Sequence, residues 1–313
     1  SVLGDGNTVK NITLHVRGSW PYGYGDLLGK GGNSIIGGLN KHSGMQITSS
    51  KTRVLGCEIY MRSFGHGFYI QRGASGVHFE DCYVEGKMRA TDEMLEETSG
   101  IAYEKNFAST YRNRDGEKKI APGYMKSLAE DGFRSYGPKN LTFVNCTSKN
   151  MRHGWEVRPG NVTLKHCKAV GNEVGFWIGG DSVVKKSVGN AKYGPLFFLE
   201  GNNIKMEVGL LPATANKDVK VHSLGTIQGA ENEIWIRPIA GKREKQVPIK
   251  LGYSQPSAGE NMSPYGRAEA RDIILKNATR MPIEISEKAE DCKIFSRGRV
   301  IKNEGSRIDI KRR

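Results

Sequence analysis

The chain carries a repeat of about 22 residues, which restricts its fold more than any other feature of the sequence. Each unit begins with a glycine placed before a short apolar segment. These glycines are Gly44, Gly67, Gly132, Gly154, Gly175 and Gly194. A small residue follows 12 to 15 positions later, and the successive residues are Cys57, Cys82, Cys146, Cys167 and Ser187. Two markers that keep one phase indicate a repeat of the solenoid type.

Apolar and polar residues alternate within each unit. The segments VHFEDC, LTFVNC, VTLKHC and SVVKKS superpose. Alternation of period two predicts β-strands, and neither the period of helical repeats nor the leucine pattern of leucine-rich repeats is present. We therefore predict an all-β fold, a right-handed parallel β-helix in which equivalent residues stack about 4.8 Å apart. Residues 1–313 are expected to form one domain, with regular coils over 9–210 and less regular coils over 211–313.

The cysteines take equivalent positions in successive units and belong to no C-x-x-C pair. A free cysteine packs well as a small apolar residue. We expect Cys57, Cys82, Cys146 and Cys167 to form one buried column without disulfides. Asparagines such as Asn11, which lie in Asn-x-Ser/Thr triplets, are interpreted as turn residues before strands.

In architecture, the stretch from GHGFYIQRGASGVHFEDC to GPLFFLEGNNIKMEV resembles the pectate-lyase-like superfamily of right-handed β-helices. The resemblance covers most of residues 9–210 and implies an enzyme that cleaves acidic polysaccharides as a lyase or a hydrolase. It also implies a secreted, periplasmic or cell-surface protein, although the first ten residues do not have the form of a signal peptide. The GHG at Gly65–Gly67 is similar to that of polygalacturonases, but their paired aspartate motifs and Arg-x-Lys are absent here.

The formal net charge of +14 favours an anionic partner. An acidic polysaccharide or oligosaccharide is preferred over nucleic acid, because the positive charge is spread along the chain without a nucleic-acid-binding motif. No apolar run is long enough for a membrane span. The oligomeric state is left open.

Strand alternation predicts a polar and aromatic strip on the outside of the coils. The expected outward residues are His66, Tyr69, Gln71, Asp131, Arg134, Tyr136, His153, Glu156, Arg158 and Trp177. Aromatic rings stack on sugars and arginine forks bind carboxylates, so this pattern is typical of a saccharide groove. Tyr69, Gln71, Tyr136 and Trp177 are the predicted substrate-binding residues. The alternative is a solvated polar face with scattered aromatics.

Two insertions, 18–43 and 87–130, interrupt the repeat at the same corner of the coil. Solenoids place insertions on one face, which is often the binding face. We expect the insertions to form the walls of a cleft, with Lys126 near the end of the longer one. The alternative is that the longer insertion only covers the solenoid.

A lyase needs a base that removes the proton next to a uronate carboxyl, and positive charge beside that carboxyl. His66 or His153 is the predicted base, with Lys126 as a further candidate. Arg134 and Arg158 are expected to neutralise the carboxylate, and Tyr136 to protonate the leaving oxygen.

The second hypothesis is an inverting hydrolase that uses Asp131 and Glu156, whose Cα atoms should lie about 11 Å apart. The third is a glycan-binding solenoid without catalysis, such as an adhesin or tailspike. The strand faces carry too few carboxylates to assign metal ligands, so no cofactor is firmly predicted and calcium is the candidate left open. Arg134 and Glu156 should be stacked neighbours in any of these cases.

Overall fold

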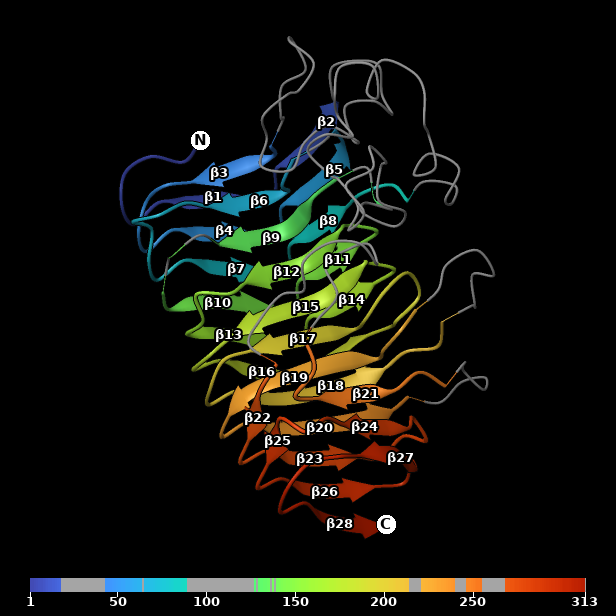
Figure 1. Cartoon of the computed structure of the whole chain (residues 1–313). Coiled ribbons are helices and arrows are strands. Elements are labelled where there is room, and N and C mark those ends of the chain that lie inside the picture. Colours follow the sequence, from blue (N-terminus) through green and yellow to red (C-terminus); the bar gives the residue numbers. More distant parts are fainter. Residues whose placement is uncertain are drawn as a thin grey trace, which may run out of the picture.

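The computed structural model describes residues 1–17, 43–63, 65–88, 127, 129–135, 137, 139–213, 221–239, 246–254 and 268–312. These residues form strands that pair in parallel from coil to coil. In Figure 1, strands of one sheet cross the front towards the left and those of the other return behind them, from the N-terminus at the top to the C-terminus at the bottom. The coils therefore wind right-handed, as parallel β-connections almost always do. The predicted parallel β-helix is confirmed.

One side of the solenoid is a single parallel sheet, here called sheet A. Its strands are β3 (Met45–Ile47), β6 (Phe68–Ile70), β9 (Asp131–Ser135), β12 (His153–Val157), β15 (Val174–Gly179), β17 (Phe197–Glu200), β19 (Gly225–Ala230), β21 (Ile249–Leu251), β24 (Ile283–Ile285) and β27 (Val300–Asn303). Two short strands, β22 (Ala270–Arg271) and β25 (Ala289–Glu290), also belong to this sheet. The end of β19 pairs in parallel with β22, and β22 pairs with β25.

The other side, sheet B, has two strands per coil near the N-terminus. The first of each pair is β1 (Thr8–Lys10), β4 (Arg53–Leu55), β7 (His78–Glu80), β10 (Leu141–Val144) or β13 (Val162–Lys165). The second is β2 (Thr13–Arg17), β5 (Glu58–Arg62), β8 (Tyr83–Glu85), β11 (Thr147–Lys149) or β14 (Lys168–Val170). From β16 (Val183–Gly189) onward, one longer strand replaces the pair.

The later strands of sheet B are β18 (Lys205–Leu210), β20 (Glu233–Pro238), β23 (Ile274–Asn277), β26 (Lys293–Ser296) and β28 (Asp309–Arg312). They continue the ladder that begins with β16. The C-terminal third therefore extends the same two sheets. No helix long and apolar enough to cross a membrane occurs in the described part of the chain.

Stacked aromatic rings fill the core between the sheets. Phe68, Phe133, Trp155 and Phe176 follow one another at ring-centroid distances of 4.9 to 5.0 Å. All four are fully buried. Burial of one such side chain contributes about 1.5–3 kcal/mol, so the repeat accumulates stability coil by coil.

The cysteine column is confirmed. The strands that follow these residues pair in register, which places Cys57, Cys82, Cys146 and Cys167 on successive coils. All five cysteines are buried and free. Burial raises the pKa of the Cys146 thiol, so it stays protonated.

The residue before each column position turns the chain through the left-handed region. Asp81, Asn145 and His166 have φ values of 54°, 53° and 55°. Asparagine and aspartate tolerate this conformation better than most residues. Asn11, at φ 56°, has the same conformation, which supports its interpretation as a turn residue.

The glycine column holds from Gly44 to Gly175 but fails at Gly194. Phe176 pairs with Phe197, so Leu196 takes the position of Gly175 in the next coil. A Cβ at Gly67 would lie 2.4 Å from Val84 Cγ2, because a sheet B side chain already fills that space. The Leu196 side chain instead lies beside Gly189 of the preceding coil, where an added Cβ would be 2.4 Å from Leu196 Cδ1.

The two insertions follow β2 and β8 and precede β3 and β9, so both connect sheet B to sheet A at one corner. Most of 18–43 and 87–130, including Lys126, lies outside the described residues. Tyr136 does as well.

Candidate functional site

The outer face of sheet A carries the strip that the sequence predicted. Tyr69, Arg134, Glu156 and Trp177 occupy one register column on β6, β9, β12 and β15. Asp131 and His153 occupy a second column three residues earlier. Arg134 and Glu156 are stacked neighbours, as predicted.

Asp131 is the centre of the site. It is fully buried, and one of its oxygens lies 3.0 Å from His66 Nδ1. The other oxygen lies 2.9 Å from His153 Nδ1 and 3.1 Å from Arg152 Nη2. Burial alone would raise the pKa of this carboxyl, but Arg152, His153 and His66 outweigh it and hold the pKa well below its ordinary value. Asp131 is therefore an anion at any pH near neutral.

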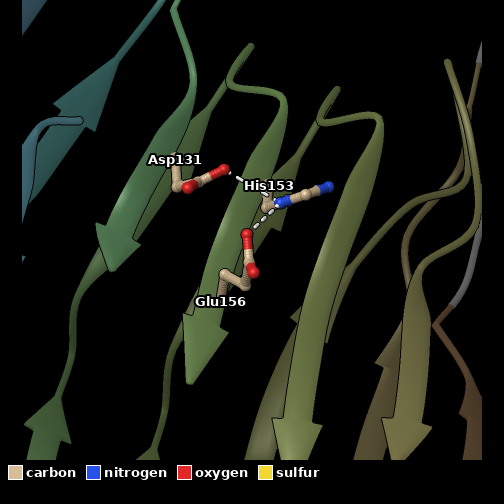
Figure 2. A group of neighbouring side chains, drawn as sticks. All are labelled: Asp131, His153 and Glu156. Carbon is tan, nitrogen blue, oxygen red and sulfur yellow. Dashed lines mark hydrogen bonds and ion pairs between the residues drawn. The ribbon is translucent and has the colours of Figure 1, made fainter. Parts of the chain in front are cut away.

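His153 is held through one ring nitrogen. Its Nδ1 lies 2.7 Å from Glu156 Oε2 and 2.9 Å from Asp131 Oδ1, while the other nitrogen points away from both carboxylates (Figure 2). Burial and the Arg152 guanidinium lower the pKa of His153 to about 4, against the opposing effect of Asp131. The neutral ring donates its Nδ1 proton to the carboxylates. This tautomer leaves the lone pair on Nε2.

Arg134 and Glu156 form a buried ion pair between Nη1 and Oε1. Arg134 Nε also lies 3.8 Å from Asp131 Oδ2. Removing one partner of a buried pair leaves an uncompensated charge, which costs about 3–5 kcal/mol. This pair therefore holds the side chains on the outer face of β9 and β12 in place more strongly than an exposed ion pair would.

Two members of the network, Glu130 and Arg152, were missed from the sequence. Glu130 Oε2 lies 3.5 Å from His66 Nε2, and Arg152 Nη1 lies 3.7 Å from Glu130 Oε1. Each immediately precedes a strand, where the alternation of side chains does not yet apply. Their charged neighbours, Asp131 and His153, were the available signal.

Ligand atoms of Asp131, His153 and Glu156 lie within 4.8 Å of one another, which is close enough for the three to share a metal ion. Two guanidiniums already neutralise these carboxylates and would repel a divalent cation. Calcium also requires six to eight oxygen ligands. These three residues therefore do not fit a calcium ion.

Trp177 has a different environment from the one predicted. Only 2% of its surface is exposed, and it packs with Val174 and Phe198 in a small apolar cluster outside sheet A. Its ring lies 4.8 Å from the Arg158 guanidinium carbon, and its Nε1 donates a hydrogen bond to Glu200. Trp177 therefore orders this end of the strip and offers no open ring face to a sugar.

Arg158 is the exposed cation of this end. It lies 3.2 Å from Glu200, two coils further on, because Gly179 between them has no side chain to intervene. At the other end, the half-buried Tyr69 contacts His66 at a ring distance of 5.0 Å. Gln71, also half-buried, directly follows β6.

Comparisons with known proteins add little to this site. No protein-family model matches the chain, and no curated protein matches its sequence. Among solved structures, the chain is similar to an endo-xylogalacturonan hydrolase from Aspergillus tubingensis, with 12% identity and a TM-score of 0.31. The match covers 88% of this chain and 63% of that one. A likeness this distant leaves the site to be interpreted from the residues of this chain.

Proposed function

We propose that this protein is a polysaccharide lyase that cleaves an acidic polysaccharide by β-elimination. The observation that carries the proposal is the arrangement of His153. Its Nδ1 is fixed by Asp131 and Glu156, and its unprotonated Nε2 points away from them. A neutral, oriented imidazole is the form that a general base needs.

In the proposed reaction, His153 Nε2 takes the proton from the carbon next to the uronate carboxyl. The electron pair of that C–H bond forms the new C=C bond, and the bond to the leaving sugar oxygen breaks. That oxygen takes a proton from an acid, for which Tyr136 is the sequence-based candidate. Asp131 and Glu156 then stabilise the imidazolium, as a carboxylate does for the histidine of a catalytic triad.

A uronate enolate requires positive charge beside its carboxylate, and the guanidiniums of this site are the candidate source, although each is paired with a carboxylate of the chain. Arg134 and Arg152 flank His153, and Arg158 is exposed at the rim. The overall charge of +14 favours a polyanionic substrate in the same sense. Such a polymer is met outside the cytoplasm, so we also propose a secreted, periplasmic or cell-surface location.

Hydrolysis by Asp131 and Glu156 has less support. An inverting pair is about 6.5–9.5 Å apart to admit a water, whereas ligand oxygens of these two residues lie within 4.8 Å. A general acid also needs a raised pKa, and that of Asp131 is lowered. Binding without catalysis is the remaining alternative.

Incubation with a panel of acidic polysaccharides tests the proposal. Absorbance of unsaturated uronate and release of reducing ends should rise together. The His153→Gln variant should lose both signals. His78→Gln is the matched control, because His78 also pairs with a carboxylate, Glu80 at 3.2 Å, but lies on sheet B. Reducing ends without unsaturated product would indicate a hydrolase, and neither signal would indicate binding alone.

A further inference from the structure

An exposed aromatic strip lies on the outer face of sheet B, on the side of the solenoid away from His153. Glu207, Trp235, Lys276, Phe295 and Lys311 occupy one register column across β18, β20, β23, β26 and β28. These strands follow one another through the lower half of Figure 1. The residues of this column do not belong to the site around His153.

Trp235 is the exposed tryptophan of the described residues. Its side chain is 43% exposed, whereas Trp155 and Trp177 are 0% and 2% exposed. Ile239, on the same face, is 38% exposed. Exposed apolar groups that lie together in a patch mark binding sites, whereas single exposed apolar residues are normal on a protein surface.

The second aromatic of the column, Phe295, is half-buried and lies two coils beyond Trp235. Two coils span about 9–10 Å along the solenoid axis. Cations accompany both rings, with Arg237 5.5 Å from the Trp235 ring and Lys311 5.8 Å from the Phe295 ring. The two rings therefore form spaced stacking positions along the axis, each beside a positive charge.

The flanking column contains Lys205, Glu233, Ile274, Lys293 and Asp309, and its two acids form ion pairs with lysines of the Trp235 column. Arg237, Lys276 and Lys311 pair with Glu207, Glu233 and Asp309. Lys205 and Lys293 are exposed and have no ion pair with any residue in the described ranges. They stand in one column three coils apart, beside the column of Trp235 and Phe295.

We propose that Lys205, Trp235, Lys293 and Phe295, here called the Trp235 strip, form a second, non-catalytic binding surface for an acidic polysaccharide that lies along the solenoid axis. Aromatic faces suit sugar rings, and the two lysines suit carboxylates. The charge selects a polyanionic glycan over a neutral one. The proposal does not depend on the reaction at His153.

Fluorescence of the full chain tests the strip, with the His153→Gln variant as background so that no cleavage intervenes. Sodium polygalacturonate is the probe and dextran is the neutral control. Polygalacturonate should protect Trp235 from iodide quenching, and dextran should not. The Trp235→Phe variant should lose the protected signal while it keeps its fold, because the exposed ring supports little of the core.

Charge reversal gives the second readout. Lys205→Glu combined with Lys293→Glu should raise the Kd for polygalacturonate about tenfold or more and reduce its dependence on salt. The matched control reverses Lys165 and Lys185, two exposed lysines that are register partners elsewhere on sheet B. Equal Kd values for the two double variants would overturn the proposal.

Two further outcomes would also overturn it. Equal protection by dextran would remove the argument from charge. Protection that depends on protein concentration without polysaccharide, with a dimer in analytical ultracentrifugation, would make a second copy the occupant. If variants of the Trp235 strip lose polygalacturonate binding but still cleave short oligosaccharides, the strip is supported and the proposed lyase reaction is unaffected. The two proposals can therefore fail separately.

Discussion

At the scale of single residues, His153 is the group whose replacement is most informative. His153→Gln should lower kcat by about 10²–10⁴, because the amide cannot accept the proton. The wild-type kcat/KM should fall as pH decreases through about 4, where the free His153 becomes protonated. Steady-state rates across pH on the best substrate of the panel check both points. An unchanged rate in His153→Gln would move the base to His66 or Lys126.

The Arg134–Glu156 pair predicts a stability effect at the same scale. Arg134→Met leaves the buried Glu156 carboxylate with only His153 and Arg152 beside it, and should cost up to about 3–5 kcal/mol of unfolding free energy. The double variant Arg134→Met, Glu156→Gln should recover part of that loss. Urea unfolding of the single and double variants measures the coupling. Additive losses would show that the two residues do not act as a pair.

Sequence alternation identified most members of the site and missed specific ones for physical reasons. It gives the face of a sheet on which a side chain lies, and so it placed Asp131, His153 and Glu156 correctly. It does not extend to the residues immediately before a strand, where Glu130 and Arg152 lie. It also does not report what packs over a face, which is why Trp177, His153 and Glu156 were expected on an open outer face and are buried.

At the scale of strands, a Cβ at any anchor glycine from Gly44 to Gly175 would meet a backbone carbonyl of the next coil, and at Gly67 it would also meet a sheet B side chain. Gly67→Ala would place Cβ 2.4 Å from Val84 Cγ2 and 2.9 Å from Gly132 O. Overpacking of this kind costs about 1–3 kcal/mol. Val84→Ala removes the closest contact, so the double variant should be more stable than the sum of the two losses predicts. Urea unfolding of all three variants checks this.

The exception at Leu196 shows why the coil register could be predicted only in part. The repeat was found because glycine and cysteine mark positions where size is limiting. Register after Gly175 depends on a pair of residues from different strands, Leu196 over Gly189. A pattern along one strand does not contain that relation, so the sequence assigned Gly194 instead.

At the scale of the whole molecule, the buried network makes the fold sensitive to acid. Unfolded His153 binds a proton near its ordinary pKa of 6.5, but in the folded protein it does so only near 4. Between these values the unfolded state holds more protons, so stability decreases as pH falls. Asp131 acts in the same direction below its ordinary pKa of 3.8, because its folded pKa is lower still.

The expected loss from His153 between pH 6.5 and 4 is on the order of 3 kcal/mol, since each unit of pKa shift is worth about 1.4 kcal/mol. That is a large part of the 5–15 kcal/mol that holds a typical domain folded. Unfolding free energies from urea titrations at pH 7, 5.5 and 4.5 measure the slope. His153→Gln should flatten it because glutamine does not titrate, whereas His78→Gln should leave it largely in place. A slope that persists in His153→Gln would assign the acid sensitivity to other groups.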